Sequence, residues 1–287
     1  MKKNLLLLAA AFAATTLMVG CAMFSSEKDE GADNRAKLNK LVTQARNPEK
    51  IEKTGDQKID ALADASTVLY ERARKEFNNY LDQTRGPIPV GKMADFIQKN
   101  VEQAEVTEKD YLDHARELIN SDELGLTAAE KKGLTPEGLY KQGKEYYALN
   151  QYIAFVKEYD AAEDKKACEA KAQESKNNWA YIKLGEKVYK DKGLDKVNWD
   201  EKLKVVKEII NDAARITKDA GDLLNGLVSN GFSLSADVKQ KTDALNGIKN
   251  QALFSKDAGL WLTDEYIGMK LAHATGLNLG RLSNIGD

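Results

Sequence analysis

The sequence predicts an all-α fold, a multi-helix bundle or helical array of six or more amphipathic helices. From residue 39 onward, apolar residues recur three and four positions apart, which is the helical period, and no segment has the two-residue alternation of a half-buried strand. The 287 residues include only four prolines, so few positions interrupt a helix. Charged residues make up 31% and hydrophobic residues 42% of the chain, a balance typical of folded rather than disordered proteins.

The first part of the chain contains three helical patterns. The first long helix has an apolar face made of Ile59, Leu62, Ser66, Leu69, Ala73, Phe77, Tyr80 and Thr84. Residues 86–89 (Gly-Pro-Ile-Pro) end this helix, because proline has no amide hydrogen to continue it. The next two apolar faces are Met93, Ile97, Val101 and Ala104, then Leu112, Ala115 and Ile119 in a helix that Thr107 and Asp110 cap.

Helix caps and breakers divide the remainder of the chain. Thr127 and Glu130 have the spacing of a capping box for a short helix that ends at Gly133, and Thr135-Pro136-Glu137 opens a long one. Residues 160–178 are rich in helix formers but have little apolar surface to bury. Later helices are predicted over 179–189, from a capping box at 198–201 to Asn230-Gly231, and over 235–253. The long penultimate helix has a face made of Val206, Ile210, Ala213, Thr217, Ala220, Leu224 and Leu227.

Two tyrosine-rich segments, 139–147 and 181–189, align with a shift of 42 residues. In both, a bulky residue is followed by glycine (Gly143, Gly185) and then tyrosine, which resembles the first helix of a tetratricopeptide repeat, where glycine allows a neighbouring helix to approach. The period of that family is near 34 residues and at least three copies are usual. We therefore interpret the two segments as helices that pack independently against a common core.

The N-terminus has the organisation of an export signal. Lys2 and Lys3 precede an almost unbroken apolar stretch from Leu5 to Leu17, and residues 18–21 read Met-Val-Gly-Cys. A cysteine directly after Gly20 resembles the lipobox of bacterial lipoproteins, in which a dedicated peptidase cuts before the cysteine and its sulfur receives diacylglycerol. The family pattern has leucine three positions before the cysteine, where this chain has Met18.

This resemblance implies three segments: a signal peptide over 1–20, a lipidated Cys21 with a flexible linker over 21–37, and a helical domain over 38–287. The expected membrane partner is reached through the N-terminal lipid anchor. In a Gram-negative cell, Ala22 in place of aspartate after the cysteine implies transport to the outer membrane, facing the periplasm. Removing residues 1–20 takes away two lysines and no acids, so the formal net charge falls from −2 to −4, and we expect no nucleic-acid binding.

The sequence contains no pattern that favours catalysis, and we expect neither an enzyme nor a cofactor. Glycine-rich phosphate loops, a dinucleotide fingerprint and a Gly-x-Ser-x-Gly elbow are all missing from the sequence. Asp110, His114 and Glu117 share one helical face, as metal-binding side chains of helical bundles do. Such a site needs a second set of ligands, and His273 has no carboxylate three or four residues before it, so we expect no metal and interpret the face as solvated ion pairs.

Cys168 is the one thiol that remains if Cys21 is acylated. Its neighbours Lys165, Lys166 and Lys171 predict a lowered thiol pKa, which would suit pairing with another molecule. The interpretation that we favour is an ordinary residue on an open helix face, where alanine-like residues vary freely.

The expected function is that of a non-catalytic binding or structural module, anchored at the envelope and engaging an envelope protein. Tyrosine and tryptophan dominate interface hot spots, so the predicted partner or ligand surface comprises Tyr140, Tyr147, Trp261, Tyr266 and Met269. The C-terminal region is the most apolar part of the mature chain and predicts a central helix of the bundle. The alternative function is a helical carrier of an apolar or lipid-like ligand, with a pocket lined by Trp261, Tyr266 and Met269.

Overall fold

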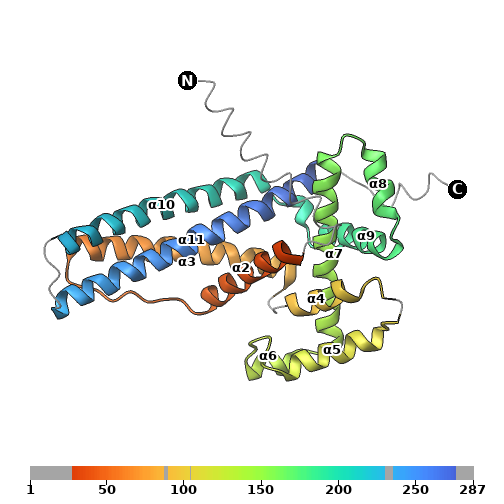
Figure 1. The fold of residues 1–287 in the computed structure, drawn as a ribbon, viewed down its shortest axis with the longest axis horizontal. Helices are drawn as coiled ribbons and strands as arrows, with labels where there is room; N and C mark the ends of the chain where they lie inside the picture. The colour runs from red at the N-terminus through yellow and green to blue at the C-terminus, as the bar shows by residue number, and fades with distance from the viewer. Residues whose placement is uncertain (1–27, 87–89, 104, 230–234, 276–287) are drawn as a thin grey trace. The chain divides into compact units, whose positions relative to one another are not determined.

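The computed structural model describes residues 28–86, 90–103, 105–229 and 235–275. These residues form helices joined by turns and contain no strand, which confirms the all-α prediction (Figure 1). The segment predicted to be a signal peptide and Cys21 lie outside the described residues. None of the helices in the described ranges combines the length and apolar character that a membrane span requires.

The sequence predicts a single helical domain over 38–287. In the structure, the chain separates into two compact units. The first, called here the long-helix unit, comprises Lys28–Tyr80 and Asn198–Ile267. The second, called the α7 unit, comprises Leu81–Val197 and the described residues from Gly268 onward. Each unit joins segments that are far apart in the sequence, and this pairing leaves no trace in local periodicity.

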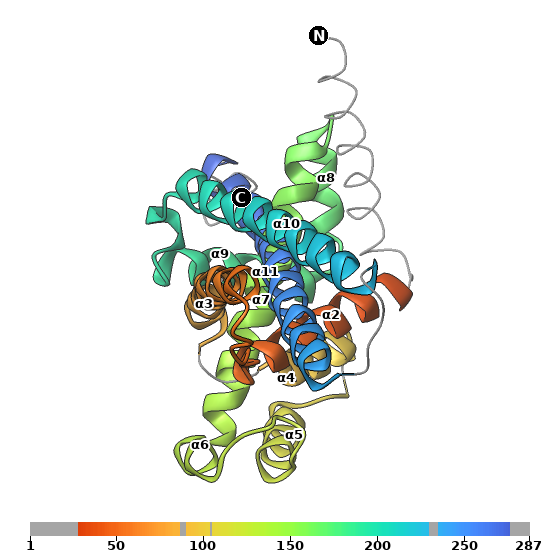
Figure 2. The same cartoon turned by 90° about the vertical axis from the view of Figure 1, so that its left-hand side faces the viewer.

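The long-helix unit contains α2 (Lys28–Arg46) and parts or all of α3 (Gln57–Arg85), α10 (Trp199–Ser229) and α11 (Ala236–Thr275). Helices α3, α10 and α11 lie side by side (Figures 1 and 2). Ser66 of α3 donates a hydrogen bond to the carbonyl oxygen of Ile248 on α11 at 3.2 Å, and Arg72 forms a 2.8 Å ion pair with Glu208 of α10.

Aromatic rings from α3 and α11 form the centre of the long-helix unit. Phe77 lies edge-on to Phe254 and Trp261 with ring centroids 6.3 and 5.3 Å apart, and Tyr70 contacts Phe254 at 4.9 Å. The predicted face of α3 is buried except for Leu62, which is partly exposed. On α10 the buried face is rotated slightly from the prediction: Val206, Ile209, Ala213, Ile216 and Ala220 are buried, whereas Thr217 is exposed.

Helix α2 begins at Lys28, inside the segment for which the sequence predicts a linker. Leu41 and Ala45 are buried, and the end of the helix is held by side chains of α3. Tyr70 donates its hydroxyl to the carbonyl oxygen of Gln44 at 2.9 Å, and Arg74 donates to that of Ala45 at 2.6 Å. Tertiary contacts of this kind stabilise a helix that is too polar at its start to be recognised from periodicity.

The α7 unit is built around α7 (Pro136–Ala161). Its other elements are α4 (Gly91–Asn100), α5 (Glu108–Asn120), α6 (Ala128–Gly133), α8 (Lys165–Gln173), α9 (Lys176–Asp191) and a 3₁₀ turn over Leu194–Lys196. The predicted capping residues act as such: Asp110 accepts from the amide of Thr107 at 2.8 Å, and Glu130 accepts from that of Thr127 at 2.7 Å. Helix α4 ends at Asn100, before the predicted Val101 and Ala104, and Ala104 lies outside the described residues.

The glycines of the two aligned tyrosine-rich segments, Gly143 and Gly185, both lie where α7 meets another helix. A Cβ atom on Gly185 of α9 would overlap the carbonyl oxygen of Ala148 and lie 2.6 Å from Cβ of Tyr152, both on α7. A Cβ atom on Gly143 of α7 would lie 2.6 Å from Cγ of Met93 on α4. The glycines therefore allow close approach, as the repeat resemblance implies, but the two segments pack against each other.

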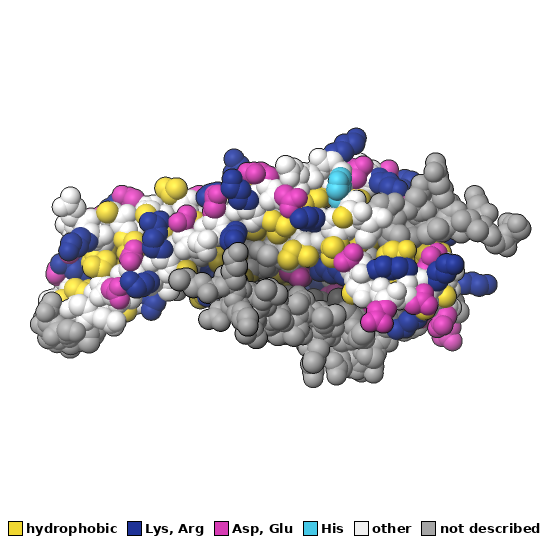
Figure 3. Space-filling view, turned by 90° about the horizontal axis from the view of Figure 1, so that it is seen from above, with side chains coloured by type: hydrophobic (Ala, Val, Ile, Leu, Met, Phe, Trp, Pro, Cys, Tyr) yellow, Lys and Arg dark blue, Asp and Glu magenta, His cyan; other side chains and the backbone are white. Residues whose placement is uncertain are grey.

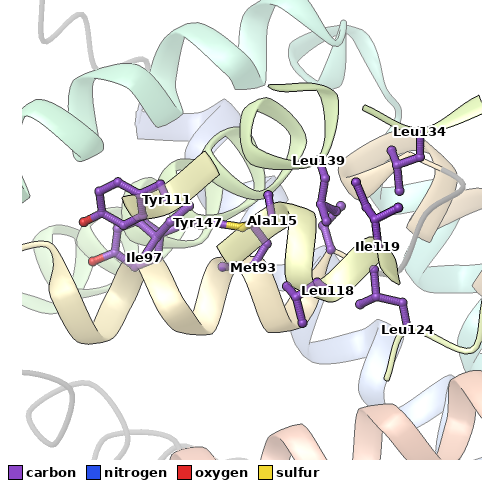
Figure 4. Packing of buried hydrophobic residues seen from close by; sticks show 12 residues of the cluster. Met93, Ile97, Tyr111, Ala115, Leu118, Ile119, Leu124, Leu134, Leu139 and Tyr147 are labelled. Atoms are coloured by element: carbon purple, nitrogen blue, oxygen red, sulfur yellow. The ribbon is translucent and has the colours of Figure 1, made fainter. Parts of the chain in front are cut away.

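The core of the α7 unit is formed by α4, α5 and α7 together with the turns that flank α6 (Figure 4). Its buried members are Val90, Met93, Ala94, Ile97, Tyr111, Ala115, Leu118, Ile119, Leu124, Leu134, Leu139 and Tyr147. Burying such side chains contributes roughly 1.5–3 kcal/mol each relative to leaving them exposed. The unit therefore has a hydrophobic core of its own.

Candidate functional site

Four tyrosines of the α7 unit gather at one side of its core, and we call them the tyrosine cluster. They are Tyr111 of α5, Tyr140 and Tyr147 of α7, and Tyr181 of α9. Tyr111 and Tyr140 are stacked, with ring centroids 5.3 Å apart and planes 8° from parallel. Tyr147 and Tyr181 meet edge to face at 4.9 Å. Tyr140 and Tyr147 are seven residues apart on α7, so they share one face of that helix.

The hydroxyls of the tyrosine cluster have no hydrogen-bond partner in the part of the chain that the structure describes. Tyr147 is 6% exposed and Tyr111 is 8% exposed, so both rings are buried. No hydrogen bond to another described residue is formed by any of the four hydroxyls, although other buried tyrosines, such as Tyr189, donate to the backbone. The hydroxyl oxygens of Tyr111 and Tyr147 point to the same side (Figure 4). Water or a partner must satisfy these groups, because an unpaired polar group excluded from water is costly.

Electrostatics keep the tyrosine cluster neutral. Burial, followed by the Glu102 carboxylate, raises the pKa of Tyr147 to about 12. Burial, then Glu108, raises the pKa of Tyr140, and burial together with the neighbouring phenols raises that of Tyr181. Each hydroxyl therefore retains its proton near neutral pH and can both donate and accept a hydrogen bond.

Further rings and cations border the tyrosine cluster. Phe96 lies edge-on to Tyr111 at 5.7 Å and stacks on His114 at 3.9 Å. The ammonium of Lys144 lies 5.7 Å from the centre of the Tyr140 ring. The result is a mixed aromatic and polar region, a composition that is enriched where proteins bind one another.

The predicted surface residues are divided between the two units. Tyr140 and Tyr147 meet in the tyrosine cluster, whereas Trp261 and Tyr266 belong to the long-helix unit and Met269 to the α7 unit. Tyr266 is 1% and Met269 2% exposed, so neither can form a surface, which corrects the prediction. Both are packed because their apolar spacing on α11 faces the core.

The carrier hypothesis requires an open pocket beside Tyr266 and Trp261. In the structure, both side chains pack against other aromatic rings. The Tyr266 ring lies 5.4 Å from the rings of Tyr80 and Trp199, and Trp261 lies 5.5 Å from Tyr80. An open groove between α3 and α10 is lined by Lys58, Ala61, Leu62, Ala65, Asp219, Asp222 and Leu223. None of the predicted carrier residues contributes to that groove.

Tyr111 and Tyr181 are site residues that the predicted surface does not include. Tyr111 is next in sequence to Leu112 of the predicted apolar face of α5, and Tyr181 is the first residue of the aligned segment 181–189. For Tyr181 the available signal is the density of tyrosine in its segment, whereas Tyr111 is the only tyrosine between residues 81 and 139 and gives no such signal. Their meeting with Tyr140 and Tyr147 depends on how α5 and α9 pack on α7, which local spacing does not reveal.

The face with Asp110, His114 and Glu117 is occupied by local interactions. Asp110 caps α5 by accepting from the hydroxyl of Thr107 at 2.7 Å, and His114 stacks on Phe96 and lies 3.7 Å from Glu117. Within the described ranges, no three acidic, histidine or cysteine side chains are arranged to hold a metal ion.

The environment of Cys168 differs from the prediction. Burial and the Glu158 carboxylate raise the pKa of the thiol, and they outweigh the opposite influence of Lys165 and Lys171. The basic neighbours in the sequence are thus not the dominant groups around the sulfur in space. A raised pKa leaves less of the reactive thiolate at neutral pH.

Comparisons with protein-family models, curated proteins and solved structures find no match to this chain.

Proposed function

We propose that this protein is a bacterial lipoprotein, anchored in the envelope through Cys21, whose helical part is a non-catalytic module that binds an envelope protein. The N-terminal residues support the anchor, since a positive start, an apolar stretch and Gly20-Cys21 occur in the order that export and acylation require. In a Gram-negative cell the anchor lies in the outer membrane and the helices face the periplasm.

The tyrosine cluster carries the binding part of the proposal. It combines large rings with four hydroxyls that have no hydrogen-bond partner among the described residues. Aromatic side chains held rigidly by packing lose little entropy when a partner binds, and tyrosine hydroxyls give such a contact its specificity. We assign the contact surface to Tyr140 and Tyr181, which are partly exposed, with Tyr111 and Tyr147 supporting them.

Lipidation is tested by mass spectrometry of the N-terminal peptide, using protein purified from the membrane fraction of the cells that produce it. We expect a peptide that begins at Cys21 and carries a diacylglycerol, with no such peptide from a Cys21→Ser variant. An unmodified peptide that begins at another residue would overturn the anchor while leaving the binding proposal open.

Partner binding is tested by placing a photo-crosslinking amino acid at residue 140 or 181 in cells. The matched control is residue 132, where Lys132 is exposed on the neighbouring α6. We expect the same second protein to be captured from positions 140 and 181 and not from 132. A double Tyr140→Phe, Tyr181→Phe variant keeps the rings and should weaken the complex about tenfold, since two hydrogen bonds are lost.

The carrier alternative predicts a different result in the same preparation. Native mass spectrometry of the extracted protein would then show a bound lipid or another small apolar molecule. Such a mass, together with a Tyr140→Phe, Tyr181→Phe variant that behaves like the wild type, would replace the partner-binding proposal.

A further inference from the structure

Helix α11 presents a stripe of three apolar side chains to solvent. Leu253 and Leu260 are each 46% exposed and Ile267 is 43% exposed. The three residues are seven positions apart, so they lie within about 40° of one another around the helix and span roughly 21 Å along it. We call them the α11 stripe.

The α11 stripe is separate from the face that α11 uses inside the long-helix unit. The residues that point to the core are Ile248, Gln251, Ala252, Phe254, Ser255, Ala258, Leu262 and Tyr266, all of them buried. Gly259 also faces inward, where an added Cβ would lie 2.8 Å from Cγ1 of Ile210 on α10. The stripe occupies the middle of the opposite face, and its three leucine and isoleucine side chains are spaced like one position of a coiled-coil heptad.

The charges beside the α11 stripe have opposite signs on its two edges. At 100° per residue, Lys256 lies about 50° to one side of the stripe and Asp257 about 50° to the other. Neither side chain forms an ion pair with another described residue. In Figure 3, hydrophobic side chains likewise emerge in narrow groups between charges of both signs.

We propose that the α11 stripe binds the same stripe of a second copy, with the two helices parallel and in register. In a parallel pair related by a twofold axis along the helices, opposite edges face each other, so Lys256 meets Asp257 of the second copy and Asp257 meets its Lys256. In an antiparallel pair, like edges face each other, which brings Asp257 and Asp264 close to the same residues of the second copy. Charge complementarity therefore favours the parallel homodimer over the antiparallel one.

The orientation is tested by disulfide cross-linking of the full chain, purified in mild detergent, in a Cys21→Ser, Cys168→Ser background where the introduced cysteine is the only thiol. In the parallel dimer, Leu253→Cys and Ile267→Cys variants each cross-link with themselves, and a mixture of the two gives no additional heterodimer. In the antiparallel arrangement, the mixed pair would cross-link and the separate variants would not, which would overturn the proposal.

The interface is tested by sedimentation at protein concentrations up to about 1 mM, a range chosen because three half-exposed side chains support only weak association. Leu260→Glu should raise the dissociation constant at least tenfold. Val68→Glu is the matched control, because Val68 of α3 is 70% exposed and lies outside the stripe. A wild-type monomer at every concentration, or an equal effect of Val68→Glu, would contradict the proposal.

A charge exchange tests the pairing of Lys256 with Asp257. Lys256→Asp alone places two acids opposite each other and should weaken the dimer about tenfold, and adding Asp257→Lys should restore it. A double variant as weak as the single one would show that these residues do not meet across the interface.

Discussion

The hydroxyl of Tyr266 donates a 2.7 Å hydrogen bond to Oε1 of Glu76 within the long-helix unit. The same oxygen accepts from the ammonium of Lys202 at 2.7 Å. Glu76 belongs to α3, Lys202 to α10 and Tyr266 to α11, so a single carboxylate connects three helices. Burial and this carboxylate raise the pKa of Tyr266, which keeps the phenol protonated as a donor.

Removal of the Tyr266 hydroxyl tests the importance of this link. We expect Tyr266→Phe to lower the free energy of unfolding by about 1.5–3 kcal/mol, because a largely buried carboxylate loses one of its two donors. Unfolding in urea followed by tryptophan fluorescence is the appropriate measurement, since Trp199 and Trp261 both lie in this unit. Tyr140→Phe is the control and should change the stability by less than about 0.5 kcal/mol, as its hydroxyl has no partner among the described residues.

Local features of the fold are predictable from the sequence, and non-local ones are not. The caps at Thr107 and Thr127 and the start at Thr135-Pro136 depend on residues three positions apart, so pattern alone identifies them. The division into two units depends on α3 pairing with α10 and α11 across more than one hundred residues. No local pattern encodes which amphipathic faces meet.

The candidate site shows the same limit. The enrichment of tyrosine at interface hot spots selects Tyr140 and Tyr147, but it equally selects Tyr266, whose hydroxyl donates to Glu76 in the core. In the sequence, a tyrosine at an apolar helix position has the same pattern whether its hydroxyl is hydrogen-bonded inside the core or is left without a partner among the described residues. What separates them is whether a neighbouring element supplies a hydrogen-bond partner, and this is decided by tertiary packing.

Gly185 is expected to be among the positions least tolerant of substitution. Gly185→Ala would force α9 away from α7, because the added methyl group overlaps the backbone carbonyl of Ala148. We expect a loss of about 3 kcal/mol in the free energy of unfolding. Gly221→Ala on α10 is the matched control, since nothing lies within 4 Å of its Cβ position. It should raise stability by about 0.5–1 kcal/mol, so a loss in both variants would point to a general intolerance of alanine.

Asp60 should make the stability of the long-helix unit dependent on acid pH. Its carboxylate accepts hydrogen bonds from the amide of Thr54 at 2.8 Å, the hydroxyl of Thr54 at 3.0 Å and the amide of Gly55 at 3.1 Å. The bond from the Thr54 amide is the main cause that lowers the pKa of Asp60 below its ordinary value of 3.8. On acidification, the unfolded chain therefore takes up a proton at this carboxyl before the folded chain does.

The stabilisation by Asp60 is thus complete above the unfolded-state pKa and is lost as the pH falls through the lower, folded-state pKa. We expect Asp60→Asn to shift the urea midpoint downward at pH 7, and the difference in midpoint from the wild type to narrow as the pH falls below 3.8 and through the lower, folded-state pKa. A gap that stays constant over this range would mean that the carboxylate charge does not stabilise the turn at Thr54.

Cys168 should react slowly with thiol reagents, because burial and Glu158 disfavour its thiolate. The measurement is the rate of alkylation between pH 7 and pH 10 in a Cys21→Ser chain, where Cys168 is the only thiol. Glu158→Gln removes the nearby negative charge and should increase the rate at pH 8 about two- to fivefold, whereas Lys171→Gln removes a favourable charge and should decrease it.

If both variants change the rate in the same direction, altered access to the sulfur rather than its charge environment controls the reaction. If the wild-type thiol reacts faster than free cysteine at the same pH, the lysines lower its pKa and the expectation of slow reaction is wrong.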